Sequence, residues 1–146
     1  MTDSLFDQFR ETFKGDVITP SDDGYENAIA RWSKNAVRRA RIVAYVKDAE
    51  DVSTAIKFAK MSGLPFTVHG GGHSPNGSSS SDGGLVVDLA RYCNGVKVDK
   101  DKRIAYVGGG ATWADVNNET IKYDLAMTGG TVGSVSVFVL IVFVRP

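Results

Sequence analysis

The amino-terminal residues carry the pattern of an amphipathic helix. Residues 4–7 (Ser-Leu-Phe-Asp) match a capping box, in which the first side chain caps a helix. The apolar positions here fall on one helical face, and they are Leu5, Phe6, Phe9 and Phe13. We expect this helix to end near Gly15. A loop over residues 17–24, which contain a proline and two aspartates, and a short helix over residues 25–33 should follow.

The pattern over residues 42–68 predicts a strand, a helix and a second strand. Residues 42–46 are an apolar, partly β-branched run. Asp48 can cap a helix whose apolar positions recur at helical spacing until Gly63, a typical residue at a helix end. Residues 66–68 are again strand-like. Because a strand, a helix and a strand in this order form a βαβ unit, the two strands should be parallel.

The second half of the chain predicts antiparallel strands and one more helix. Residues 85–88 have strand composition, and residues 96–98 and 103–107 have the pattern of a hairpin. A second capping box, Thr112 to Asp115, predicts a helix that continues to about Tyr123. The fold class that follows is α+β, with the βαβ unit first and antiparallel strands after it.

Residues 69–84 form an unusual loop of six glycines and five serines, HGGGHSPNGSSSSDGG. Such a tract is either a flexible linker or a functional loop. Three consecutive glycines let a backbone approach a ligand, and their N–H groups can bind an anion such as a polyphosphate. The known nucleotide fingerprints are absent, because Pro75 interrupts a G-x-G-x-x-G pattern here and Trp113 interrupts it after Gly108.

Composition narrows the function classes. A length of 146 residues, with 42% hydrophobic residues, fits about one domain, and a formal net charge of zero argues against a nucleic-acid binder and gives no reason for a membrane partner. A single cysteine, Cys93, excludes an internal disulfide and multi-cysteine metal sites. The longest apolar run, residues 137–144, is too short to cross a bilayer, and no signal-peptide pattern is present. We therefore expect a cytoplasmic protein.

Both histidines lie in the glycine-serine loop, four residues apart. They could be a metal pair, although that spacing puts two side chains on one face only in a helix. They could also be exposed residues without a task. A third interpretation is a nucleophilic imidazole beside a bound cofactor, aimed by the glycine turn. The remaining candidates have ordinary explanations: Cys93 as an indifferent thiol, Trp113 as a packing residue, and Arg38, Arg39 and Arg41 as solvated surface.

Five motifs resemble one family of enzymes, the FAD-linked oxidases of the berberine-bridge-enzyme-like branch of the p-cresol methylhydroxylase and vanillyl-alcohol oxidase flavoproteins. In chain order they are Gly70-Gly-Gly-His-Ser74, the serine-rich stretch, Asp82-Gly-Gly-Leu-Val-Val-Asp-Leu89, Gly108-Gly-Gly-Ala-Thr-Trp113 and Thr128-Gly-Gly-Thr-Val132. The resemblance covers roughly residues 35 to 137. It implies an FAD-binding domain of the p-cresol methylhydroxylase type, with an N-terminal βαβ subdomain and the start of an antiparallel second subdomain.

The resemblance also implies which residues hold the cofactor. His73 would be joined covalently to the 8α-methyl carbon of FAD, and the loop would wrap the pyrophosphate. The cofactor-binding residues implied are Gly70, Gly71, Gly72, His73, Ser74, Gly77, Gly129, Gly130, Thr131, Val132 and Gly133. His69 is given no role beyond loop contact, and neither a metal site nor a catalytic residue is expected.

The resemblance ends near residue 138, where family members continue with a glycine-rich stretch and a substrate domain. Here the chain has the apolar residues 138–144 instead. We expect a truncated or frameshifted gene, or else a buried terminal strand. The predicted division is a helical lead-in over residues 1–34, an incomplete FAD-binding domain over 35–137 and a divergent tail over 138–146.

These observations leave three hypotheses for function. The chain is the FAD-binding part of an oxidase that passes a hydride from an organic substrate to FAD and then to dioxygen, it is an inactive fragment, or it is a nucleotide-binding module without redox chemistry. The expected partner is FAD, with a small organic substrate only in a full-length form. Because the family's substrate-reacting residues lie beyond this sequence, we expect little activity from this chain alone.

Overall fold

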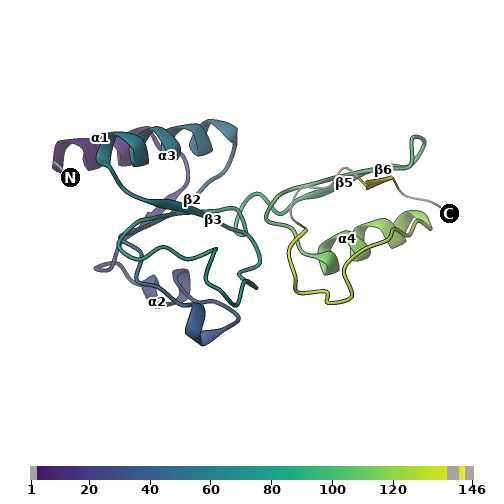
Figure 1. The fold of residues 1–146 in the computed structure, drawn as a ribbon. Coiled ribbons are helices and arrows are strands. Elements are labelled where there is room, and N and C mark those ends of the chain that lie inside the picture. Colours follow the sequence, from purple (N-terminus) through teal and green to yellow (C-terminus); the bar gives the residue numbers. More distant parts are fainter. Residues whose placement is uncertain (1–2, 138–141, 144–146) are drawn as a thin grey trace.

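The computed structural model describes residues 3–137 and 142–143, which form two lobes (Figure 1). The elements of the first lobe are α1 (Asp3–Thr12), β1 (Asp16–Ile18), α2 (Tyr25–Ala28), β2 (Ile42–Tyr45), α3 (Ala49–Ser62), β3 (Phe66–His69) and β4 (Leu85–Asp88). Those of the second are β5 (Val96–Asp99), β6 (Ile104–Val107), α4 (Trp113–Thr120) and β7 (Val142–Phe143). Short 3₁₀ turns lie at Lys34–Ala36 and Ile121–Tyr123. None of the described helices has the length and apolar character needed to span a membrane.

The first lobe contains a mixed sheet in the order β1-β2-β4-β3. Both β2 and β3 run parallel to β4, whereas β1 is antiparallel to β2. The predicted parallel relation of the βαβ strands is therefore confirmed, with β4 inserted between them. The expectation that residues 85–88 belong to the antiparallel strands of the second half was wrong, because the long glycine-serine loop returns the chain to the first sheet in the parallel direction. Tyr45, Asp88 and His69 occupy one row at the carboxyl ends of the three parallel strands.

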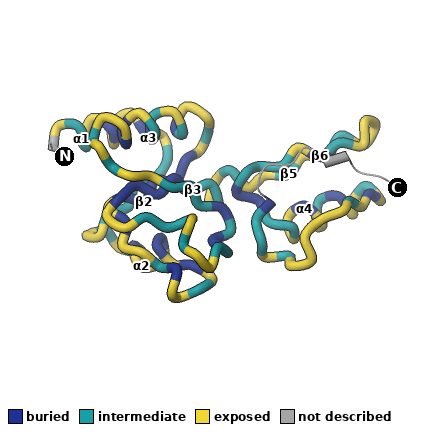
Figure 2. The backbone as a smooth tube through the Cα atoms, viewed as in Figure 1, coloured by how far each residue is buried: buried dark blue, intermediate teal, exposed yellow. Residues whose placement is uncertain are grey.

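Helices cover both faces of this sheet, so every residue of β2 and β4 is buried (Figure 2). Ile42 and Ala44 face a cluster with α1 and α3, in which the rings of Phe9 and Phe58 stack with centroids 4.3 Å apart. Val43 belongs to a second cluster with α2 and its flanking residues. The alternation follows from the two-residue repeat of a strand, and it explains why these strands are continuous apolar runs.

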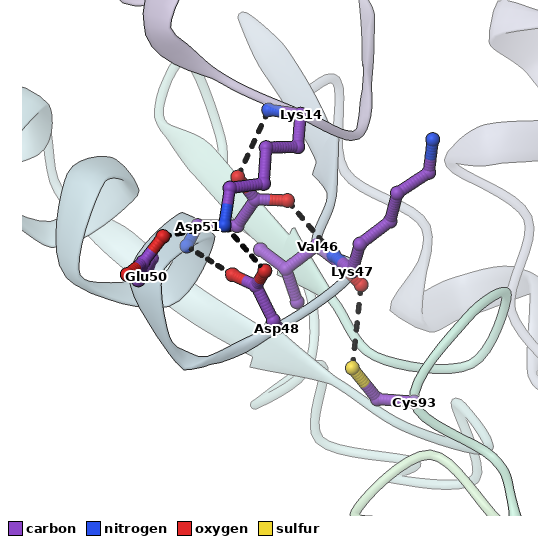
Figure 3. Close-up of polar contacts among 7 residues, drawn as sticks. All are labelled: Lys14, Val46, Lys47, Asp48, Glu50, Asp51 and Cys93. Atoms are coloured by element: carbon purple, nitrogen blue, oxygen red, sulfur yellow. Dashed lines mark hydrogen bonds and ion pairs between the residues drawn. The ribbon is translucent and has the colours of Figure 1, made fainter.

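A buried carboxylate fastens the start of α3 to the rest of the lobe (Figure 3). Asp51 accepts hydrogen bonds from the main-chain N–H groups of Lys14 and Lys47, both at 2.9 Å, and is only 1% exposed. Nearby, the half-buried Cys93 thiol donates to the Val46 carbonyl at 3.3 Å. Burial, together with the charges of Asp48 and Asp51, raises the pKa of Cys93. A raised pKa lowers the fraction of the nucleophilic thiolate at neutral pH.

The second lobe is a hairpin with α4 packed against it. β5 and β6 pair antiparallel, as predicted, and β7 continues the sheet on β6. α4 begins with the predicted capping box: Thr112 Oγ1 accepts from the Asp115 N–H at 3.3 Å, and Asp115 accepts from the Thr112 N–H at 2.8 Å. Of the apolar tail, only residues 142–143 are described, so the expectation for the other residues of 138–146 lies outside the described part.

Three local predictions were wrong. The first helix already includes Asp3, so Ser4 lies in its first turn and is not its cap. Residues 16–18 form β1, because they pair with the edge of β2, an effect that local sequence does not encode. The short helix ends at Ala28 rather than at residue 33, since the chain turns there and places Arg31 in a buried position.

Candidate functional site

The loop between β3 and β4 forms a pocket beyond the carboxyl ends of the parallel strands, where open α/β sheets bind their ligands. The pocket has a volume of about 520 Å³, which is within the size range of small-molecule sites. Its lining residues are Thr67, Val68, Gly70, Gly72, His73, Ser74, Ser78, Ser79, Val135 and Ser136. The last two come from the other lobe.

The glycines are needed because two parts of the chain meet here. A Cβ atom on Gly71 would lie 2.8 Å from the Ser136 nitrogen, closer than side chains pack. A Cβ atom on Gly70 would lie 3.1 Å from Ser136 Oγ and 3.3 Å from the Gly109 carbonyl oxygen. Three glycine-rich or serine-rich stretches that are far apart in sequence thus converge on one point.

The loop presents a row of free main-chain donors. Among the described residues, the N–H groups of residues 70–74 have no hydrogen-bond acceptor. Gly72 has a φ of 68° and Gly77 a φ of 78°, left-handed values that favour glycine. The buried hydroxyls of Ser79 and Ser80 also lack a partner in the described structure. Because buried donors are normally satisfied, this arrangement fits an anionic group that carries several oxygen atoms.

His73 stands at the pocket wall against an aromatic ring. Its imidazole stacks on the indole of Trp32, with ring centroids 5.6 Å apart and an angle of 21° between the planes. The main-chain N–H of Trp32 donates to the Gly72 carbonyl at 3.3 Å, which ties the backbone of this residue to the turn that carries His73. Trp32 is 71% exposed, which is unusual for a tryptophan side chain.

His69 has a definite partner, contrary to the expectation of loop contact alone. It is the last residue of β3, and its Nδ1 lies 2.6 Å from Asp88 Oδ2. The other oxygen of Asp88 accepts from the Ala90 N–H at 2.8 Å, and the side chain is 3% exposed. A Cβ atom on Gly72 would lie 2.7 Å from His69 Nε2, so the imidazole packs closely against this glycine. The His69–Asp88 pair therefore lies directly against the glycine turn at Gly72. Within the described residues, no group of three metal-ligating side chains gathers.

The second predicted stretch, residues 129–133, does not line the pocket. Gly129 and Gly130 lie against the indole of Trp113, where a Cβ would collide with the ring. The Gly133 carbonyl accepts from the Ala114 N–H at 2.9 Å, and Thr131 and Val132 are exposed. The stretch therefore packs on α4 and leads to Val135 and Ser136, which are the residues that reach the pocket.

Sequence reasoning missed several residues of the site. Val135 and Ser136 directly follow the predicted glycine stretch, and Ser79 lies in the serine-rich tract, so proximity to these motifs was an available signal. Asp88 lies inside the Asp82–Leu89 motif, although its partner His69 was not predicted. Arg31 and Trp32 gave no such signal, since they meet the loop only in the folded chain.

Residues 40–141 match the family model described as FAD binding domain. The chain belongs to this family. It is 34% identical over 119 residues to (R)-6-hydroxynicotine oxidase of Paenarthrobacter nicotinovorans, covering 82% of this chain and 26% of that protein. An uncharacterized FAD-linked oxidoreductase of Bacillus subtilis is 30% identical over 121 residues, covering 83% of this chain and 27% of that protein.

The solved structures agree. The crystal structure of 6-hydroxy-D-nicotine oxidase from Arthrobacter nicotinovorans superposes with a TM-score of 0.82 at 34% identity, covering 86% of this chain and 27% of that chain. The berberine-bridge-enzyme-like protein 1 of Physcomitrella patens gives 0.77 at 21% identity, over 89% of this chain and 29% of that one, which shows the same fold. The α+β fold and the family expected from the motifs are thus confirmed. The chain spans about a quarter of the length of the curated relatives it matches.

Proposed function

We propose that this chain is the FAD-binding part of a flavin-dependent oxidase and that His73 holds FAD covalently. The whole protein would pass a hydride from a small organic substrate to FAD and then to dioxygen. The observation that carries the proposal is the position of His73, at the wall of a pocket whose adjoining N–H groups are free. Family membership and the oxidases among the relatives support it.

The glycine turn would hold the pyrophosphate of FAD. The main-chain N–H groups of residues 70–74 have no acceptor among the described residues, and free main-chain donors in a glycine turn can stabilise phosphate oxygens. The Ser79 hydroxyl, which belongs to a pocket-lining residue and has no partner in the described structure, can donate a further hydrogen bond. The absence of side chains at Gly70 and Gly71 lets the segment with Ser136 approach closely, so Ser136 can line the pocket.

His73 would form the covalent link. A neutral imidazole nitrogen is a nucleophile, and the stacked Trp32 ring restricts the orientation of the His73 ring. Attachment replaces the imidazole N–H and one C–H of the 8α-methyl group with a C–N bond. The two protons and two electrons released convert dioxygen to hydrogen peroxide, so the step is balanced. When bound, FAD supplies the acceptor for a hydride.

The test is flavin fluorescence that survives denaturation. The 146-residue chain is expressed, denatured and run on a gel, with His73→Ala and His69→Gln beside it. We expect a fluorescent band for the wild type and for His69→Gln, because only His73 forms the bond. His73→Ala should give a dark band.

A dark wild-type band from soluble, folded protein would contradict covalent attachment. Retention of FAD through a desalting column by that same protein would leave a non-covalent flavin site. Absence of any flavin from folded protein incubated with excess FAD would instead favour a module without redox chemistry.

A further inference from the structure

Arg31 is a buried cation that the glycine motifs do not explain. It lies between α2 and the first 3₁₀ turn and is 9% exposed. Its guanidinium donates to three main-chain carbonyls: to Ser79 at 2.7 and 3.1 Å, to Ala30 at 2.6 Å and to Ala28 at 3.4 Å. Within residues 3–137 and 142–143, no carboxylate forms an ion pair with it.

The position of Arg31 is directly behind the pocket wall. Ser79, whose carbonyl it binds twice, lines the pocket, and the Ser79 hydroxyl has no partner. Gly72 also lines the pocket, and a Cβ there would lie 3.3 Å from the Arg31 Cδ. Arg31 therefore contacts two parts of the pocket wall. One is the glycine turn at Gly72, and the other is the serine tract at Ser79.

The charge of Arg31 is only partly balanced. Asp88 is near enough for its charge to raise the pKa of Arg31, but both Asp88 oxygens are bound, by His69 and by the Ala90 N–H. Burial lowers the pKa of Arg31 overall, yet an arginine starts so far above neutrality that it stays protonated. A buried cation without an ion-pair partner is costly unless something else justifies it. An anionic ligand at the adjoining wall would do so.

We propose that Arg31 is a positioning residue for the anionic part of the dinucleotide. It fixes the Gly72 and Ser79 sides of the pocket through its forked hydrogen bonds, and its charge favours a pyrophosphate against that wall. The inference rests on the proposed function, since it takes the pocket as the FAD pyrophosphate site. It adds a determinant from outside the loop and predicts selectivity for the phosphates over the nucleoside.

The experiment compares ADP with adenosine, which lacks the pyrophosphate, by calorimetric titration of the 146-residue chain. The variants are Arg31→Gln, Arg31→Lys and, as the matched control, Arg41→Gln. Arg41 is an exposed arginine at the amino end of β2, at the opposite edge of the sheet from the pocket. We expect Arg31→Gln to weaken ADP binding about tenfold, the effect of one charge-assisted contribution, with adenosine unchanged. Arg41→Gln should bind both as the wild type does.

Lysine keeps the charge but cannot form the fork, so Arg31→Lys should retain part of the preference for ADP. If Arg31→Gln does not fold, as judged by thermal unfolding, the same comparison is made on Arg31→Lys, with a smaller loss for ADP alone. Unchanged ADP affinity, or an equal loss for ADP and adenosine, would overturn the role of Arg31 and leave FAD binding standing. A wild type that binds ADP but acquires no covalent flavin contradicts the His73 link only. A wild type that binds no ADP overturns both the role of Arg31 and the assignment of the pocket as the pyrophosphate site.

Discussion

Asp51 shows what a single buried side chain contributes to this fold. Its two oxygens each accept a main-chain N–H, one from the turn after α1 and one from the segment that joins β2 to α3. A carboxylate is suited to this position because both of its oxygens accept hydrogen bonds. Glycines 70 and 71 show the opposite case, in which the site depends on a missing side chain.

We predict that Asp51→Asn lowers the free energy of unfolding by about 1.5–3 kcal/mol, the range for hydrogen bonds to a charged group. The amide has only one acceptor oxygen, so its NH₂ group would face an N–H donor and leave both unsatisfied. Urea unfolding measures the change. The control is Glu50→Gln, since Glu50 is exposed and pairs with Lys14 on the surface (Figure 3). It should change stability by less than about 0.5 kcal/mol. Equal losses in the two variants would refute the special position of Asp51.

At the scale of elements, α3 is defined at both ends by its own residues. Asp48 accepts from the Asp51 N–H at 3.0 Å as the N-cap, and Gly63 ends the helix with a φ of 68°. Both ends were predicted because capping is a local property. The other carboxylate oxygen of Asp48, Oδ2, lies 2.6 Å from Lys14 Nζ. This ion pair connects the start of α3 to the segment that follows α1.

Because of this ion pair, the stability that Asp48 contributes at the start of α3 depends on pH. The hydrogen bond from Lys14, followed by the Asp51 N–H, holds the pKa of Asp48 below its usual value. A depressed folded pKa means that the stabilisation is complete above the unfolded value of about 3.9 and is lost as the pH falls through the folded value. We expect Asp48→Ser, which keeps a capping oxygen without the charge, to lose less stability than the wild type when unfolding is measured between pH 5 and 2 (approximate limits). Parallel pH profiles would contradict this.

At the scale of the whole molecule, the two lobes meet through glycine contacts and a short stretch of main chain. Ser136 forms a bridge with Thr112 and also lies against Gly70 and Gly71. The main-chain N–H of Trp113 donates to the Val135 carbonyl at 3.0 Å, and the main-chain N–H of Val137 donates to the Ala111 carbonyl at 2.8 Å. The pocket therefore depends on the second lobe holding this segment against the first.

We predict that Gly71→Ala displaces residues 134–136, because its Cβ would lie 2.8 Å from a main-chain nitrogen that cannot move alone. Overpacking of this kind costs about 1–3 kcal/mol. Hydrogen exchange should speed up at the amides of Trp113 and Val137. The control is Gly95→Ala, whose Cβ would have open space around it. Wild-type exchange rates in Gly71→Ala would show that the lobes do not depend on this contact.

Most of the helices and strands, the fold class and the family could be predicted from the sequence alone. Caps, helical spacing and apolar runs act within a few residues, so α3, α4, the parallel strands and the hairpin were all predictable, and the loop motifs identified the FAD-binding family. The order of the strands in the sheet and the contacts between distant residues became known only from the tertiary structure. It placed β4 between β2 and β3, made residues 16–18 a strand, and paired His69 with Asp88. It also brought Arg31 and Ser136 to the pocket. These contacts join residues distant in sequence, and their energy comes from burial and hydrogen bonds that exist only once the chain has folded.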